Sequence, residues 1–257
     1  MRVLVAIPVY NEARTIEKVL HEVRQYAEHI LLVNDGSTDG SAEVIARQTD
    51  VHQVHHARNS GYGAAIASAF QYTIDHDFDV LVTMDCDGQH EANRIAVLLE
   101  ALTADVDIVS GSRYLRDFKH NTPAPNERRW VNQQITEVIN GRYSLNLTDS
   151  FCGFKAYRRR ALEQFAITEY GWGMPLQVWV QAVQHQMKIV EVAVPRVYLD
   201  LNRTFGALND AQERLAHYRT LLNTAEKQSR QSMGCQCDVT LGGCNCGGSM
   251  ARVEACT

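Results

Sequence analysis

Short apolar runs alternate with amphipathic stretches along most of this chain. The apolar runs lie between polar or glycine-rich segments and predict strands at 2–8, 30–34, 51–55, 79–84, 106–110 and 188–194. After the first run, Asn11 or Thr15 is placed to cap a helix whose apolar residues recur at helical spacing, at Ile16, Val19, Leu20 and Val23. Helical patterns also follow the second and third runs. Such alternation is typical of an α/β fold with a mostly parallel sheet.

The pattern changes beyond residue 112. It loosens from about 112 to 150, where a helical stretch runs through Ile135, Val138 and Ile139, and we interpret this region as a lid or insertion. A polar amphipathic helix is predicted over 207–231, with apolar positions at Leu208, Leu215, Tyr218, Leu221 and Leu222. We therefore expect a main domain over 1–206, a C-terminal helix over 207–231 and a glycine- and cysteine-rich tail over 232–257.

Composition narrows the class of protein. The chain has 257 residues, of which 45% are hydrophobic and 21% charged, as expected for a soluble globular protein. A formal charge of -5 argues against general affinity for nucleic acid. The first apolar run is too short for a signal peptide, and no stretch approaches membrane-spanning length. We expect a cytoplasmic protein with at most peripheral membrane contact, for which "RRWVNQQITEVINGRY" is a candidate surface unless it packs on the domain.

The stretch "VLVTMDCDGQHE" at 80–91 carries the clearest candidate chemistry. A strand buried on both faces runs into Asp85 and Asp87, and burying unpaired carboxylates there would be costly. Two such carboxylates, with Gln89 as a third oxygen donor, can hold Mg²⁺ or Mn²⁺. The alternative is a solvated turn. Cys86 points to the opposite face and is interpreted as packing. His90 could approach the metal, but we interpret it as a solvated turn residue.

Two other motif readings fit poorly, and the histidines other than His90 suggest no site. Phosphatases that form an aspartyl phosphate also use Asp-x-Asp, but normally after the first strand. The loop "NSGYGAA" has Gly61 and Gly63 of a dinucleotide fingerprint, yet Ile66 occupies the third small position and the loop follows the third strand. We therefore expect no nicotinamide cofactor.

Several motifs together resemble a known family. "IPVYNE", "VNDGSTDGS", "ARNSGYGAA", "MDCDGQH" and "VSGSRY" occur in the order found in inverting family-two glycosyltransferases of the GT-A fold. "DSFCGFKAYRR" and "ERRW" are similar to the branch of dolichyl-phosphate mannose synthases and polyprenyl-phosphate sugar transferases. The resemblance spans roughly residues 2–206 and implies a GT-A, Rossmann-like sheet flanked by helices in a single domain.

The resemblance also implies a donor site. The residues that would bind the nucleotide sugar are Pro8, Tyr10, Glu12, Asp35, Asn59, Gly61 and Asp85. Asp35 would contact the base and ribose, while Asn34 replaces the first Asp of the usual pattern and leaves the choice between UDP and GDP open. Asp85, Asp87 and Gln89 would hold Mg²⁺ or Mn²⁺ against the diphosphate.

On the acceptor side, the resemblance implies that arginines bind a phosphate through their planar fork. The candidates are Arg113, Arg128, Arg129 and Arg203. Asp149 would position or deprotonate the acceptor, with Arg113 and Arg203 completing the catalytic set. A phosphate acceptor is already an anion and needs no strong base, whereas a hydroxyl acceptor does. A turn cap is the alternative role for Asp149.

This chain departs from the branch at two places. The segment "YGWGMPLQVWVQA" carries Trp172, Met174, Pro175 and Trp179 where acidic residues often stand, and it could face a hydrophobic acceptor or belong to the core. The segment after Arg203 reads "FGALND" instead of a basic ending. The acceptor is thus a lipid phosphate or another sugar acceptor.

The tail repeats Cys-x-Cys. Thiolates of Cys235, Cys237, Cys244 and Cys246 could form a structural zinc site, and a disordered tail is the alternative.

We interpret the chain as a metal-dependent inverting glycosyltransferase that uses a nucleoside-diphosphate sugar. The alternatives are a Mg²⁺-dependent phosphohydrolase and a catalytically silent partner that binds sugar nucleotides.

Overall fold

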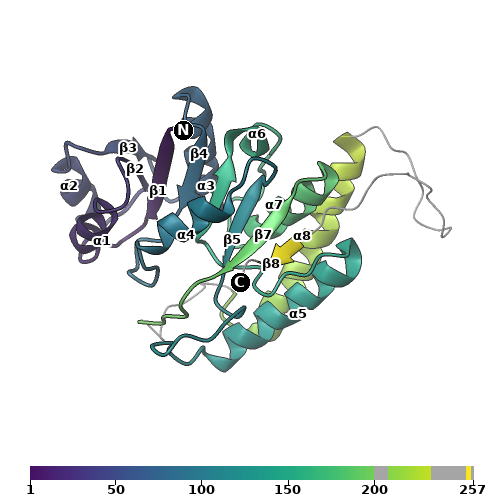
Figure 1. The fold of residues 1–257 in the computed structure, drawn as a ribbon. Coiled ribbons are helices and arrows are strands. Elements are labelled where there is room, and N and C mark those ends of the chain that lie inside the picture. The colour runs from purple at the N-terminus through teal and green to yellow at the C-terminus, as the bar shows by residue number, and fades with distance from the viewer. Residues whose placement is uncertain (200–207, 233–252, 256–257) are drawn as a thin grey trace.

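The computed structural model describes residues 1–199, 208–232 and 253–255 (Figure 1). Its centre is an eight-stranded sheet of order β3-β2-β1-β4-β6-β5-β7-β8. The only antiparallel strand among these is β6, which pairs with β4 and β5. The strands are β1 (Val3–Val9), β2 (His29–Asn34), β3 (His52–His55), β4 (Val80–Thr83), β5 (Ile108–Ser112), β6 (Lys155–Arg158), β7 (Ile189–Ala193) and β8 (Val253–Ala255).

Helices cover the sheet on both faces. Neighbouring residues of β1 point to opposite sides, so Leu4 belongs to one apolar cluster and Val5 to the other. The Leu4 side is packed by α3 (Tyr62–Asp75), α5 (Asn126–Tyr143), α6 (Arg159–Leu162), α7 (Met174–Gln184) and α8 (Ala211–Ser232). The Val5 side is packed by α1 (Ile16–Val23), α2 (Ser41–Ala46) and α4 (Arg94–Ala101).

The α/β fold with a mostly parallel sheet is confirmed, and the six predicted strands are present with ends within about two residues. All of β4 is buried, as expected for a strand covered on both faces. Strands β6 and β8 and helices α4, α6 and α7 were not predicted. Thr15 occupies the N-cap of α1, but its side chain forms no capping hydrogen bond. Helix α8 begins at Ala211, four positions after the predicted start at 207.

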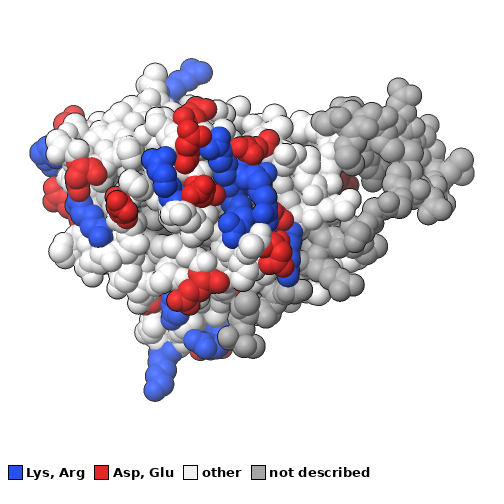
Figure 2. All heavy atoms as spheres, turned by 45° about the horizontal axis from the view of Figure 1, so that its top comes forward, with Lys and Arg blue, Asp and Glu red and all other residues white. Residues whose placement is uncertain are grey.

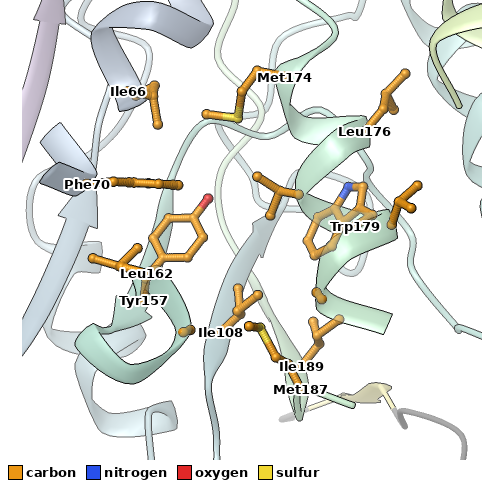
Figure 3. Packing of buried hydrophobic residues seen from close by; sticks show 14 of the residues in the cluster. Ile66, Phe70, Ile108, Tyr157, Leu162, Met174, Leu176, Trp179, Met187 and Ile189 are labelled. Atoms are coloured by element: carbon orange, nitrogen blue, oxygen red, sulfur yellow. The ribbon is translucent and has the colours of Figure 1, made fainter. Parts of the chain in front are cut away.

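The C-terminal helix α8 is part of the main core. Leu215, Tyr218 and Leu222 of α8 are buried in the same cluster as Trp179 of α7. Figure 3 shows the Trp179 ring among aliphatic side chains, including Ile108 and Ile189. These contacts show that α8 is held on the domain by apolar burial.

Helix α5 contains the stretch considered above as a membrane surface. Its Val131, Ile135 and Ile139 are buried in the core, so this apolar face packs on the domain. Among the helices in the described part of the chain, none is long and apolar enough to cross a membrane.

Charges of both signs lie side by side on the face shown in Figure 2. Ion pairs of the molecule include Arg159 with Asp77, Arg160 with Asp107 and Lys188 with Asp105. Such exposed pairs contribute little to stability. Their mixture of signs gives this face no broad patch of one charge.

Candidate active site

A cavity of about 940 Å³ opens where β1, β2 and β4 end. Parallel strands carry their carboxyl ends to the same edge of a sheet, so the polar segments that follow them meet there. The residues expected to bind the nucleotide sugar all line this cavity: Pro8, Tyr10, Glu12, Asp35, Asn59, Gly61 and Asp85. Tyr10 is 45% exposed and presents its ring at the surface.

Asp35 is held in place by the loop that follows β3. One of its oxygens, Oδ1, accepts the Ser60 N–H at 2.9 Å, and Oδ2 accepts the Gly61 N–H at 2.8 Å. His56 Nδ1 lies 2.7 Å from Oδ1, and its Nε2 lies 2.8 Å from the Ser68 hydroxyl. The expectation that His56 belongs to no constellation is therefore wrong. A usable signal was present, because His56 directly follows β3 at the same sheet edge.

Two glycines permit this close approach of loops. Gly36 has φ of +66° and Gly61 has φ of +103°, conformations that side chains other than glycine rarely adopt. A Cβ at Gly61 would lie 2.2 Å from the Tyr170 carbonyl oxygen. The glycines of this loop therefore allow close packing against neighbouring backbone.

Asp85 and Asp87 follow β4 and face the cavity. Asp85 accepts a hydrogen bond from the Tyr62 hydroxyl, and a Cβ at Gly153 would come within 2.7 Å of Asp85 Oδ2. Asp87 accepts the Gln89 N–H at 3.0 Å and the Gln89 Nε2 group at 2.6 Å. Both carboxylates are thus oriented by neighbours before any ligand binds.

This donor set fits a hard divalent cation. Among the described residues, no three His, Cys, Asp or Glu side chains cluster as a metal site, so the two carboxylates would supply only part of a coordination shell. Mg²⁺ is commonly bound by one or two carboxylates together with substrate phosphates and water. Gln89 turns its amide nitrogen toward Asp87, and its oxygen remains a predicted ligand.

His90 is not a solvated turn residue. It is 8% exposed, and its ring stacks on Phe154 with centroids 5.0 Å apart. Its Nδ1 accepts the Asp85 N–H at 3.1 Å. The solvated interpretation is wrong because the turn folds back over Phe154, and His90 instead fixes the backbone at Asp85. Cys86 is 3% exposed and packs in the core, as expected.

Arg113 and Asp149 form a bidentate pair at the other end of the cavity. Arg113 Nε and Nη2 donate to Asp149 at 2.7 and 2.9 Å, and the Arg113 N–H adds a bond of 3.2 Å. Asn132 donates to the same carboxylate at 2.7 Å. Asp149 is fully buried, while Arg113 lines the cavity.

These contacts bear on the roles left open for Asp149, whose Oδ1 also accepts the Phe151 N–H at 3.2 Å, as in a turn cap. Burial raises the pKa of the carboxyl, but the Arg113 guanidinium and the hydrogen bonds outweigh it and lower the pKa to about 2. A carboxylate with so low a pKa is a poor proton acceptor at neutral pH. The geometry favours Asp149 as the residue that positions Arg113.

Glu191 forms hydrogen bonds next to the pair of Arg113 with Asp149, and this role was not predicted. Its carboxylate accepts the Thr148 N–H at 2.8 Å, the Thr148 hydroxyl at 2.8 Å and the Asp149 N–H at 3.2 Å. Glu191 is 1% exposed, and burial raises its pKa to about 7. Its place in β7, among apolar residues, gave no sequence signal of contact with residues 148–149.

The remaining arginine candidates differ in their position relative to the cavity. Arg128 lines the cavity, with its guanidinium carbon 5.8 Å from the centre of the Tyr198 ring. Arg129 is not among the lining residues, and its guanidinium lies 3.6 Å over the Tyr114 ring. Arg203 lies outside the described residues, as do the four tail cysteines Cys235, Cys237, Cys244 and Cys246.

The segment from Trp172 to Trp179 divides between site and core. Trp179 and Met174 are buried in the core. Trp172 and Pro175 line the cavity, and the Trp172 ring stacks on Tyr62 with centroids 5.4 Å apart. The core interpretation therefore holds for Trp179 and Met174, whereas contact of Trp172 and Pro175 with a hydrophobic acceptor stays a prediction.

Charge is distributed unevenly around the cavity. The lining carboxylates belong to Glu12, Asp35, Asp85 and Asp87. The lining guanidinium groups belong to Arg113, Arg128 and Arg214. The lining thus offers carboxylates that suit a cation and guanidinium groups that suit an anion.

Comparisons with known proteins agree with this arrangement. The family model described as glycosyl transferase family 2 matches residues 4–165. An undecaprenyl-phosphate mannosyltransferase of Micrococcus luteus is 32% identical over 215 residues, covering 79% of this chain and 87% of the relative. A polyprenol monophosphomannose synthase of Mycolicibacterium smegmatis is 31% identical over 209 residues, covering 75% and 76%.

Among solved structures, glucosyl-3-phosphoglycerate synthase of Mycobacterium tuberculosis, crystallised with UDP, is similar with a TM-score of 0.68. It is 17% identical, and the match covers 88% of this chain and 80% of that one. At this level of identity the likeness supports the fold.

Proposed function

The chain belongs to glycosyl transferase family 2, and from this premise we propose that it transfers a sugar from a nucleoside-diphosphate sugar to a polyprenyl phosphate. The observation that carries the proposal is the pair of Arg113 with Asp149. The Asp149 carboxylate is paired with the Arg113 guanidinium and has a low pKa. The site therefore suits an acceptor that needs no base. A phosphate monoester is such an acceptor. The names of two relatives, an undecaprenyl-phosphate mannosyltransferase and a polyprenol monophosphomannose synthase, point to the same class of lipid.

The donor would lie at the carboxylate end. Pro8, Tyr10, Glu12 and Asp35 line the cavity and would contact the nucleoside. Asp85 and Asp87 would hold Mg²⁺ or Mn²⁺, with Gln89 as a third ligand. When bound, the cation neutralises charge that develops on the departing diphosphate.

The reaction would be one direct displacement. An oxygen of the acceptor phosphate forms a bond to the anomeric carbon while the bond from that carbon to the diphosphate oxygen breaks. The nucleoside diphosphate leaves with the electron pair, and the anomeric configuration inverts. Arg113 and Arg128 orient the attacking phosphate, with Arg203 as a further proposed contact.

Family membership favours this transferase over the phosphohydrolase and the silent partner. The direct test incubates the protein with undecaprenyl phosphate in detergent, Mn²⁺ and GDP- or UDP-linked hexoses, and detects lipid-linked sugar by mass spectrometry. Asp87→Asn should lose this product, while Asp75→Asn, at an exposed position of α3, should retain it. Release of inorganic phosphate without lipid-linked sugar would contradict the proposal.

We also propose peripheral contact with a membrane at the mouth of the cavity. Trp172 and Leu199 line the cavity and are 37% and 62% exposed. Large apolar side chains at a binding-site opening suit an acceptor whose prenyl chain stays in a bilayer. Leu199→Ser should reduce co-sedimentation with phosphatidylglycerol vesicles. Equal sedimentation of both proteins would speak against this surface.

A further inference from the structure

Helix α8 forms part of the cavity wall. Arg214 and Tyr218 lie one turn apart on this helix, and both line the cavity together with Arg113 and Arg128. Each is only 3% exposed. The matched family segment ends at residue 165, so α8 lies beyond it. The C-terminal helix therefore brings two polar groups into a site whose other lining residues all lie between Pro8 and Leu199.

Tyr218 has a hydroxyl group that lacks a partner. Within the part of the chain that the structure describes, this hydroxyl forms no hydrogen bond, although the side chain is buried at the cavity wall. Burial raises the pKa of Tyr218 to about 12, so the hydroxyl keeps its proton at neutral pH and can donate. Among the described residues, Arg94 Nε is the one fully buried side-chain polar atom without a partner, so the Tyr218 oxygen retains some exposure. A ligand oxygen in the cavity could accept the hydrogen bond of this hydroxyl.

Tyr218 is close to the Arg113 pair. Its ring lies 4.9 Å from that of Phe151, measured between centroids. Phe151 in turn donates its N–H to Asp149, the carboxylate that holds Arg113. The tyrosine is thus connected through two contacts to the predicted phosphate-binding arginine.

Arg214 adds a buried positive charge beside Tyr218. Its Nη1 donates to the carbonyl oxygens of Leu208 at 2.7 Å and Asn209 at 3.2 Å, which anchors the side chain at the start of α8. Its charge acts on Tyr218 and opposes the effect of burial on that pKa. Among the described residues, the cavity lining from position 113 onward contains guanidinium groups and no carboxylate. This end of the cavity therefore favours an anion.

We propose that Arg214 and Tyr218 form, with Arg113 and Arg128, the subsite for the phosphate of a prenyl monophosphate acceptor. The Tyr218 hydroxyl donates a hydrogen bond to a phosphate oxygen, and Arg214 supplies charge next to it. This inference rests on the proposed function, since it assigns the acceptor's phosphate to one end of the same cavity. The donor diphosphate is the other phosphate source, and the test separates the two.

The experiment measures binding by calorimetry with two probes. Farnesyl phosphate is titrated without nucleotide, and GDP and UDP are titrated with Mn²⁺. Tyr218→Phe keeps the ring packing and should weaken the binding of farnesyl phosphate roughly three- to tenfold, because it removes one hydrogen bond. Arg214→Gln should weaken this binding by about tenfold or more, as expected for a hydrogen bond with a charged group. Nucleotide binding should not change in either variant.

Two exposed residues provide matched controls. Arg219→Gln changes an exposed arginine of the same helix, and Tyr26→Phe removes the hydroxyl of a tyrosine that is 46% exposed. Both should bind farnesyl phosphate as the wild type does. If Arg214→Gln fails to fold in a thermal melt, Tyr218→Phe alone decides.

Each outcome separates the inference from its premise. Wild-type binding of farnesyl phosphate that Tyr218→Phe leaves unchanged would overturn the role of α8 and leave the proposed function standing. Weakened nucleotide binding with unchanged farnesyl phosphate binding would assign these residues to the donor. Wild type that binds nucleotide but not farnesyl phosphate would overturn the proposed acceptor, and this inference with it.

Discussion

At the scale of single residues, Asp149 offers a test of positioning against base catalysis. Asp149→Asn leaves an amide facing the Arg113 guanidinium, so the orientation of Arg113 is lost. We expect the KM for the lipid phosphate to rise about tenfold or more, with the KM for the sugar nucleotide unchanged. Steady-state kinetics with each substrate varied in turn measures both. A large fall in kcat at unchanged KM would instead identify Asp149 as a base.

Glu191 predicts how stability depends on pH. Burial raises its pKa in the folded state to about 7, from an ordinary value of 4.5. The folded protein therefore holds the proton more tightly, and this contribution to stability is present below about pH 4.5 and is lost as pH rises through about 7. The shift corresponds to about 3 kcal/mol in the free energy of unfolding. Urea unfolding of wild type and Glu191→Gln between pH 5 and pH 8 should show it.

The matched control for this pH dependence is Glu100→Gln, at an exposed position of α4. Glu100→Gln should follow the wild-type curve, whereas Glu191→Gln should lose the fall in stability near pH 7. Parallel curves for all three proteins would show that Glu191 does not titrate in this range.

Residues that follow strands were predictable, and residues brought in by tertiary packing were not. Asp35 and Asp85 come directly after apolar runs, and the common direction of parallel strands places them at one edge. Tyr218 appeared in the sequence only as an apolar position of an amphipathic helix. Its side chain lines the cavity because α8 packs against α5 and α7, which no local pattern encodes.

At the scale of elements, two of the segments that were not predicted, β6 and α7, differ from their neighbours in composition. Strand β6 contains Lys155 and Arg158, so it does not form an apolar run, yet Lys155 is buried with its ammonium 5.3 Å from the Trp179 ring. Helix α7 is buried along most of its length, so apolar residues occupy most of its positions and only Gln177, Gln181 and Gln184 interrupt them. A helical pattern is easiest to recognise where one face is exposed to solvent, and neither element has a fully exposed face.

Helix α8 carries a prediction about stability. Leu222 is fully buried in the main core, so Leu222→Ala removes apolar contacts and leaves a cavity. We expect the free energy of unfolding to fall by about 2–5 kcal/mol. Arg219→Ala, one turn away and exposed, should change it by less than about 0.5 kcal/mol. Equal urea midpoints for the two variants would show that α8 is not packed as described.

At the scale of the whole molecule, the cavity is lined by two parts of the chain, for which we propose different roles. Carboxylates before residue 90 surround the proposed donor, and guanidinium groups from 113 onward surround the proposed acceptor. The sheet order explains this, because β4 lies between β1 and β6 and so brings Asp85 next to Gly153. Strand order was beyond the reach of the sequence, since the antiparallel insertion of β6 follows no local signal.

This separation predicts that the two ends respond independently to substitution. A nucleotide with Mn²⁺ at about 100 times its Kd should stabilise the folded state by about 2.7 kcal/mol, which raises Tm by roughly 5–10 °C. Asp87→Ala should abolish the rise, because it removes one of two lining carboxylates at the proposed metal site. Arg113→Gln should keep it, since its guanidinium belongs to the acceptor end. Thermal melts with GDP and UDP, each with and without Mn²⁺, give this comparison. They also show whether the site binds guanine or uracil nucleotides. A rise that persists in Asp87→Ala, or that disappears in a well-folded Arg113→Gln, would mean that donor and acceptor are not divided along the cavity in this way.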